Sequence, residues 1–189
     1  MSQSPTDPID AIKETFTRGT QGENLIPLFV DGAIVVFLGA CSLSLLAGPL
    51  LLGYTEMCVR ITRGERVSVG DSLKAISPRF AEGFGLWILW LVAHALGAFA
   101  LGAGALVANF FLSYLFVIAV TRPGIGPVEA AQESVRRALA HPMETAVVAG
   151  VALGLHAILG ATVLGLAASV AFSTLLRVVM ARRMEPGVV

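Results

Sequence analysis

GFGLWILWLVAHALGAFALGAGALVANFFLSYLFVIAVT, the stretch from Gly83 to Thr121, contains no aspartate, glutamate, lysine or arginine. It is 39 residues long, whereas a single helix needs about 20 residues to cross a hydrocarbon core of roughly 30 Å. The stretch is therefore long enough for two membrane-spanning helices and too long for one.

Two further uncharged blocks lie on either side of it in the sequence. The first runs from Gly32 to Thr55 and becomes comparable in length if Asp31 and Glu56 lie near the membrane interface. The second runs from Thr145 to Leu176, a length of 32 residues, and Arg177 can lengthen it by extending its charged end to the lipid headgroups. Three such blocks predict an all-α, polytopic membrane helical bundle.

The overall composition agrees with a membrane protein. Apolar residues make up 56% of the 189-residue chain and charged residues 14%, where soluble domains have roughly 45–50% and about 25%. The net charge is zero, so no basic field indicates a nucleic-acid partner. The first twenty residues are polar, which argues against a cleaved secretory signal and predicts insertion from an internal segment. Cys41 and Cys58 lack a metal-binding spacing, and we expect both to be small buried hydrophobes.

The distribution of basic residues favours hairpins over single over-long spans. The thirteen basic residues precede the first block or follow one of the three blocks. Single spans would divide them between the two sides of the membrane, whereas hairpins place all of them on one side, which the positive-inside rule identifies as the cytoplasm. We therefore predict six helices in three hairpins, with both termini cytoplasmic. Small residues and proline place the turns near Leu46–Pro49, Leu101–Gly104 and Gly160–Thr162.

The blocks recur at a period of about sixty residues, which predicts one membrane domain over 1–189 with a threefold internal repeat. The pseudo-repeats cover about 7–63, 67–122 and 126–183. Each opens with an amphipathic stretch, and in the first one Ile9, Ile12 and Phe16 lie on one helical stripe. Such helices either lie along the membrane interface or cover the cytoplasmic end of the bundle, and both alternatives stay open.

Two stretches between the blocks carry a resemblance to known membrane domains. They are GYTEMCVRITRGERVSVGDSL, from Gly53, and VTRPGIGPVEAAQESVRRALAHP, from Val120. With them the chain resembles uncharacterised bacterial and archaeal multi-pass membrane domain families related to the membrane domain of glycerophosphodiester phosphodiesterases. The resemblance implies a six-helix domain in the bacterial inner membrane. It carries over no catalytic residue, because the phosphodiesterase chemistry belongs to a separate domain.

His94 and His156 are the sharpest candidates for chemistry. Each lies about ten residues into an uncharged block, and thus near the bilayer midplane, where ionisable groups are costly and often functional. On neighbouring helices, two histidines can ligate a b-type haem or relay protons. The alternative is a neutral histidine bonded to a carbonyl at a helix interface. We predict no bound cofactor, with haem as the alternative.

Other polar residues inside the blocks are candidates for a solute pathway. They are Asp31, Asn109, Ser113 and Tyr114. Asp31 alternatively acts as a cap or pairs with a basic residue at the cytoplasmic surface, and the other three alternatively satisfy one another inside the bundle. The sequence has no nucleophile, zinc or phosphate-loop motif, so it predicts neither a catalytic residue nor a metal site.

The cytoplasmic ends of the blocks carry charges with two expected roles. Arg136, Arg137, Arg182 and Arg183 form a basic rim that should attract anionic lipid headgroups, at about 1 kcal/mol per residue. Acid–arginine pairs spaced four residues apart predict ion pairs on helix surfaces. These pairs are Glu14–Arg18, Glu56–Arg60 and Glu133–Arg137.

Three functions follow as hypotheses. The first is a non-enzymatic structural or assembly subunit that packs with a protein partner, copies of itself or lipid, and it is supported by small-residue stripes such as Gly150–Gly154. The second is a small-solute or ion transporter or channel, since transporters use internal repeats and broken helices. The third is a membrane redox protein that uses His94 and His156.

Overall fold

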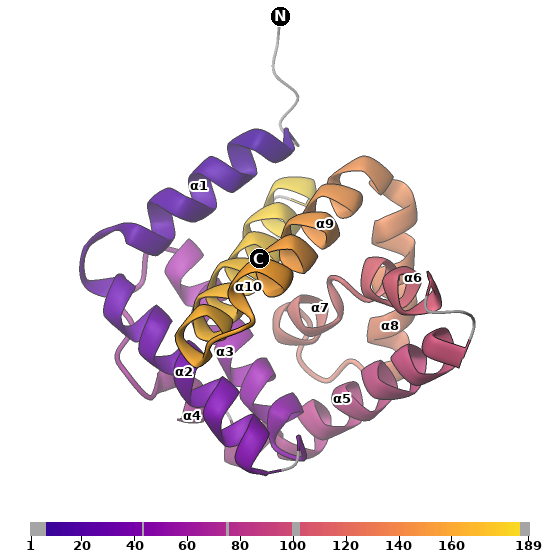
Figure 1. Cartoon of the computed structure of the whole chain (residues 1–189), viewed down its shortest axis with the longest axis horizontal. Coiled ribbons are helices and arrows are strands. Elements are labelled where there is room, and N and C mark those ends of the chain that lie inside the picture. Colours follow the sequence, from indigo (N-terminus) through magenta and orange to yellow (C-terminus); the bar gives the residue numbers. More distant parts are fainter. Residues whose placement is uncertain (1–6, 43, 75, 100–102, 186–189) are drawn as a thin grey trace, which may run out of the picture.

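The protein is helical throughout the part of the chain that the computed structural model describes, which is residues 7–42, 44–74, 76–99 and 103–185. In chain order the elements are α1 (Pro8–Thr20), the 3-10 helix η1 (Gly22–Asn24), α2 (Leu25–Cys41), α3 (Ala47–Thr62), α4 (Asp71–Lys74), α5 (Ile76–Phe99), α6 (Ala103–Phe111), α7 (Leu115–Thr121), α8 (Pro127–Ala140), α9 (Pro142–Leu159) and α10 (Val163–Met184). The helices pack as one bundle (Figure 1). The predicted all-α class is confirmed.

Local sequence signals explain where several helices begin. Asp7 caps α1 by accepting a hydrogen bond from the backbone N–H of Ile9 at 2.8 Å, and Thr162 caps α10 in the same way through Gly165. Proline occupies the first helical position of α1, α8 and α9, where its missing N–H would have had no helical partner.

Five helical segments are long and apolar enough to cross a membrane, by length and composition. They are Gly22–Cys41, Ile76–Phe99, Gly104–Thr121, Pro142–Leu159 and Val163–Met184. The remaining helix of the predicted hairpins, α3, has 16 residues, most of them buried inside the bundle. The five apolar helices are compatible with a membrane protein. The expected total of six membrane spans stays a prediction.

The connections between successive helices agree only in part with the expected turns. The turn between α9 and α10 lies at Gly160–Thr162, as expected. The first turn comes earlier than expected, because α3 already begins at Ala47 and holds Pro49 in its first turn, where proline is tolerated. The middle turn, expected at Leu101–Gly104, lies outside the described residues except for the start of α6.

Glycines allow two pairs of helices to approach closely. A Cβ added to Gly83 of α5 would lie 2.6 Å from the Cα of Pro49 in α3, and one added to Gly48 would meet the Gly83 carbonyl. Gly97 of α5 and Gly104 of α6 are in similar backbone contact. Small residues therefore set the spacing between helices here, as is common in membrane bundles.

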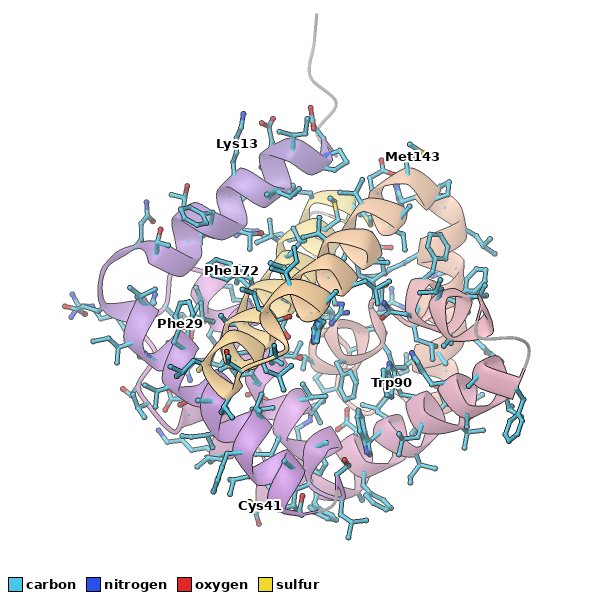
Figure 2. All side chains as sticks on the ribbon, viewed as in Figure 1. Lys13, Phe29, Cys41, Trp90, Met143 and Phe172 are labelled. Carbon is cyan, nitrogen blue, oxygen red and sulfur yellow. The ribbon has the colours of Figure 1, made fainter. Side chains whose placement is uncertain are left out.

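The last described helix, α10, lies in the middle of the molecule, between α1–α4 on one side and α5–α8 on the other (Figure 1). It contacts α1, α2, α3, α7 and α9. Phe172 of α10 packs against Phe29 of α2 at a ring distance of 5.8 Å (Figure 2). It also packs against Phe16 of α1, at a ring distance of 5.9 Å. Cys58 is buried as expected, whereas Cys41 is exposed at the end of α2, so the expectation for Cys41 is wrong.

The amphipathic helix α1 leaves its large apolar side chains partly exposed, although the ring of Phe16 still stacks on Phe172 of α10. Ile9 and Phe16 are 62% and 61% exposed, whereas the small residues Ala11, Thr15 and Gly19 are buried. The small residues of α1 are therefore the ones packed most closely on the bundle, and most of the surface of the apolar stripe stays exposed. That arrangement favours the membrane interface over the bundle as the environment of the stripe.

Ion pairs at the helix ends follow the predicted spacing in two of three cases. Glu14–Arg18 is formed at 2.7 Å and Glu133–Arg137 at 3.7 Å. The predicted pair between Glu56 and Arg60 is wrong. Glu56 instead pairs with Arg79 of α5, and Arg60 with Glu65 and Asp71, because the chain after α3 folds back across its end.

Candidate ligand-binding cavity

A cavity of about 430 Å³ lies inside the bundle, between α3, α5, α6, α7, α9 and α10. Its volume is in the range of small-molecule sites in proteins. Polar side chains in its wall come from α3, α5, α6, α9 and α10 and from the turn between α6 and α7. They are Thr55, His94, Asn109, Ser113, His156, Ser173, Thr174 and Arg177. Apolar and aromatic residues line the rest.

Within the described part of the chain, Arg177 is the only lysine, arginine, aspartate or glutamate in the wall of this cavity. It lies on α10, seven positions before the helix ends at Met184, or roughly 10 Å along the axis. Across the residues the structure describes, no acidic group lies within ion-pair distance of it, and its Nε–H is buried without an acceptor. The expectation that Arg177 extends away to the lipid headgroups is therefore wrong, and its helix turns it inward.

Three aromatic rings on α5 form a stacked row along one side of the cavity. The rings of Trp87 and Trp90 are 4.9 Å apart and those of Trp90 and His94 are 3.7 Å apart. Spacings of three and four residues put these side chains on one helical face, and Figure 2 shows Trp90 on the side of α5 toward the bundle. This face gives the cavity a flat aromatic wall.

Both cavity histidines are fixed through the same ring nitrogen. Nδ1 of His94 lies 2.9 Å from the carbonyl of Trp90, and Nδ1 of His156 lies 2.7 Å from that of Ala152. Because a carbonyl can only accept, each of these hydrogen bonds is donated by Nδ1–H of the ring. Ser169 is a second neighbour of His156 Nδ1, at 2.8 Å.

The helical segment that connects α5 to α8 in the chain is broken into α6 and α7 beside the cavity. α6 ends at Phe111 and α7 begins at Leu115. Ser134 of α8, fully buried, bridges the break: its hydroxyl donates to the Phe111 carbonyl at 2.7 Å and accepts from the Tyr114 N–H at 3.2 Å. A neighbouring side chain thus satisfies the freed backbone groups, as a broken helix in a membrane requires.

The predicted site residues divide between the cavity and other places. His94, His156, Asn109 and Ser113 all line the one cavity. Tyr114 is buried beside it without being part of its wall. The structure thus brings together four of the six cofactor and pathway candidates.

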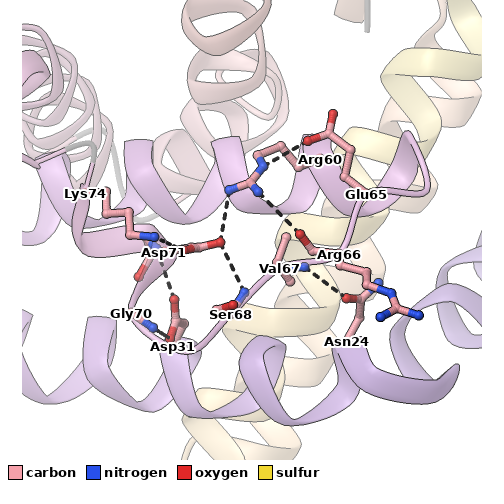
Figure 3. Close-up of polar contacts among 11 residues, drawn as sticks. Asn24, Asp31, Arg60, Glu65, Arg66, Val67, Ser68, Gly70, Asp71 and Lys74 are labelled. Atoms are coloured by element: carbon pink, nitrogen blue, oxygen red, sulfur yellow. Dashed lines mark hydrogen bonds and ion pairs between the residues drawn. The ribbon is translucent and has the colours of Figure 1, made fainter.

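Asp31 lies elsewhere, in a polar cluster that joins α2 to the loop after α3 (Figure 3). Its side chain is fully buried, and its two oxygens accept from the backbone N–H groups of Gly70 at 2.7 Å and Ser72 at 3.1 Å. Both oxygens are therefore used to hold the start of α4.

Asp71 organises the other half of this cluster (Figure 3). It accepts from Lys74 at 2.6 Å, from the Ser68 N–H at 3.1 Å and from Arg60 at 3.0 Å. The hydrogen bond from Lys74, then those from Ser68 and Arg60, lower the pKa of the Asp71 carboxyl below its ordinary value.

The four arginines of the predicted basic rim differ in exposure. Arg136 has a side chain that is 70% exposed, whereas that of Arg137 is 2% exposed and pairs with Glu185 at 2.7 Å. Arg182 donates to the Thr62 carbonyl and Arg183 pairs with Glu14. Lipid contact by this rim stays a prediction, and Arg136 is the residue best placed for it.

The sequence interpretation missed the residues that give the cavity its character. Arg177, Trp87 and Trp90 were not among the candidates. Their signal was present as helical spacing, because Trp87, Trp90 and His94 recur at three and four positions. The wall residues Ser173 and Arg177 are likewise spaced by four.

The cavity offers few side chains that could bind a metal ion or a cofactor. Within the described ranges, no three or more histidine, cysteine, aspartate or glutamate side chains are grouped to hold a metal ion. The two histidines of the cavity wall, His94 and His156, are the groups that would offer ligands. In the comparisons with known proteins, no family model, no curated protein and no solved structure matches the chain.

Proposed function

We propose that this chain is a multi-pass membrane protein that binds a small solute inside its helical bundle, as a transporter or channel does. The carrying observation is the central cavity, in which the polar side chains of several apolar helices converge. Polar and charged residues are expensive inside a bilayer and mark substrate pathways. A helix broken beside the cavity is a second feature of transporter sites.

The proposal includes a bacterial inner membrane and termini on the cytoplasmic side. The support is the charge pattern and the resemblance of the stretches from Gly53 and Val120 to multi-pass membrane domains. The exposed apolar stripe of α1 also favours a lipid surface.

A matched pair of variants on α10 tests the proposal. Val170 lines the cavity, and Val163 is 61% exposed on the same helix. Val170→Phe should fill the cavity, whereas Val163→Phe should leave it open. Proteoliposomes with the wild type or V163F should admit at least one of acetate, glycerol and urea faster than empty liposomes in stopped-flow swelling, and V170F should remove the difference.

Equal swelling rates for wild-type and empty liposomes with all three solutes would exclude a transport role for them. Equal rates for V170F and the wild type would exclude this cavity as the route. Melting curves of both variants in detergent show that each is folded before the fluxes are compared.

A second candidate function, an assembly subunit, has its own support on α9. Gly150 and Gly154 have open space where a Cβ would lie, so these glycines pack against nothing in the bundle. The nearby Ile158 is 78% exposed. Small residues on an outward face allow another helix to approach. Gly150→Leu should then lower the oligomeric mass in detergent, and an unchanged monomer would remove the support.

A further inference from the structure

The charge of the cavity wall defines what kind of solute it accepts. Among the described residues that line the cavity, Arg177 is the one with a permanent charge, and none is an aspartate or glutamate. A cation held in an apolar bundle without an opposite charge is costly. A solute that brings a negative charge removes that cost, and a solute that brings a positive charge adds to it.

Two buried N–H donors in the wall lack a protein acceptor. They are Nε of Arg177 and Nε1 of Trp87, neither of which has a hydrogen-bond partner among the described residues. Buried donors without a partner are rare in folded proteins. An oxygen atom of a bound solute is a suitable acceptor for both types of donor.

Several other polar hydrogens of the wall are used within the protein. The hydroxyl of Thr55 donates to Leu51, and that of Ser113 to Asn109. The Nδ1–H of His94 donates to the Trp90 carbonyl. Arg177 and Trp87 thus supply the buried N–H donors that remain for a solute, and the side chains of Asn109 and Thr174 are further polar groups of the wall.

The rest of the cavity wall is mainly apolar and aromatic. Trp87 and Trp90 form a stacked face, and Leu51, Leu112 and Phe116 complete the surface beside it. An inorganic anion would leave this surface uncovered. A solute with an apolar body would bury it, at roughly 25 cal/mol per Å² of apolar surface removed from water.

On this basis, and resting on the proposed solute-binding function, we propose that the cavity binds an amphiphilic anion. A carboxylate or phosphate oxygen of the solute accepts hydrogen bonds from Arg177, and the apolar body lies against Trp87 and Trp90. A free organic acid and the end of an anionic lipid share this chemistry, so the test includes both.

The protein contains a reporter for this site, because Trp87 and Trp90 are its only two tryptophans. Intrinsic fluorescence therefore measures the cavity directly. The purified protein in zwitterionic nanodiscs is titrated with octanoate, octyl phosphate, octanol, octyltrimethylammonium, acetate and inorganic phosphate. Octanoate and octyl phosphate should change the fluorescence saturably, and the four other probes should bind at least tenfold more weakly.

Two substitutions locate the anion. Arg177→Gln should raise the Kd of octanoate at least tenfold, and Arg177→Lys, which keeps the charge but not the Nε donor, should raise it less. Arg63→Gln, at an exposed position at the end of α3, is the matched control and should leave the Kd unchanged. If R177Q does not fold, the comparison of anionic, neutral and cationic octyl probes on the wild-type protein is sufficient to test the anion inference.

The outcomes separate this inference from the proposed function. Saturable binding of octanol or octyltrimethylammonium as tightly as octanoate, or an unchanged Kd in R177Q, overturns the anion inference and leaves solute binding standing. The absence of a saturable change with every probe overturns both. Replacing part of the zwitterionic lipid by phosphatidylglycerol distinguishes the sources: competition with octanoate indicates a lipid ligand, and no competition indicates a free acid.

Discussion

Asp31 and Arg177 both lie on apolar helices and point into the described bundle, but their bonding differs. Asp31 is fully buried with both carboxylate oxygens bonded to backbone N–H groups. Arg177 faces the central cavity with its Nε–H unbonded. A satisfied buried charge stabilises a structure, whereas an unsatisfied one is retained at a cost. At the scale of single residues, Asp31 therefore has a structural role and Arg177 is the candidate for ligand contact.

Asp31→Asn should destabilise the protein without affecting the cavity. The amide can accept from one backbone N–H but presents its own NH₂ group to the other, so we expect a loss of about 2–3 kcal/mol. Melting in detergent measures the loss. Glu23→Gln, in an exposed pair with Arg66, is the control and should change stability by less than about 1 kcal/mol. A D31N variant as stable as the control would contradict the assigned role.

Asp71 should make the stability of the protein depend on acid pH. Lys74, Ser68 and Arg60 lower its pKa in the folded state, so its contribution is present above the unfolded value of about 3.9 and is lost as the pH falls through the lower folded value. Melting temperatures measured from pH 7 to pH 3 should show this loss. Asp71→Asn should melt lower at pH 7 and fall less steeply toward pH 3, while a parallel decline would contradict the prediction.

At the scale of helices, close packing depends on particular glycines and not on glycine in general. Gly83 touches the backbone of α3, whereas Gly150 of α9 faces open space. The same substitution at these two positions should therefore have opposite consequences, although both glycines lie in apolar helices and look alike in the sequence.

Gly83→Ala should lower the melting temperature strongly, because the new methyl group would lie 2.6 Å from Pro49 and would push α5 away from α3. Overpacking of this kind costs roughly 1–3 kcal/mol or more. Gly150→Ala should be neutral or stabilising, by up to about 1 kcal/mol, since alanine favours a helix. Melting of both variants in the same detergent makes the comparison, and similar melting temperatures would refute the packing.

At the scale of the whole molecule, the sequence predicted the class well and the site only in part. The long uncharged blocks were enough to predict apolar helices, and the small residues at Gly160–Thr162 were enough to predict a turn. The prediction near Leu46–Pro49 places another turn too late, because Pro49 indicates a turn in the sequence although proline is also tolerated in the first turn of a helix. The pairing of Glu56 with Arg79, 23 positions away, depends on how the chain returns after α3, which spacing within one helix does not contain.

For the candidate site too, single residues could be predicted from the sequence, but their arrangement in space could not. His94, His156, Asn109 and Ser113 could be predicted one by one, since polar residues stand out in apolar helices. That they share one cavity depends on how α5, α6 and α9 are placed around α10, and no local pattern records that placement. Arg177 was assigned outward because it ends an uncharged run, whereas its direction is set by the rotation of α10.

Labelling from the two sides of the membrane tests the arrangement as a whole. Single cysteines introduced at Leu45 and Thr162, in a chain whose Cys41 and Cys58 have been replaced, should react with a membrane-impermeant maleimide added outside intact cells. Cysteines at Gly64 and Gly124, in the loops after α3 and α7, should react only after the membrane is opened. Labelling of Gly64 or Gly124 positions in intact cells would exclude the hairpin arrangement.

The central place of α10 affects how the protein is assembled during synthesis. The ribosome produces this segment after every helix that α10 contacts, so α1 and α2 must wait, without their final neighbour, until translation has passed Met184. Until then, Phe16 and Phe29 lack their shared contact with Phe172. Nascent chains that stop before this point should be preferred targets of membrane quality control, whereas completed chains should become resistant to proteolysis in a single late step.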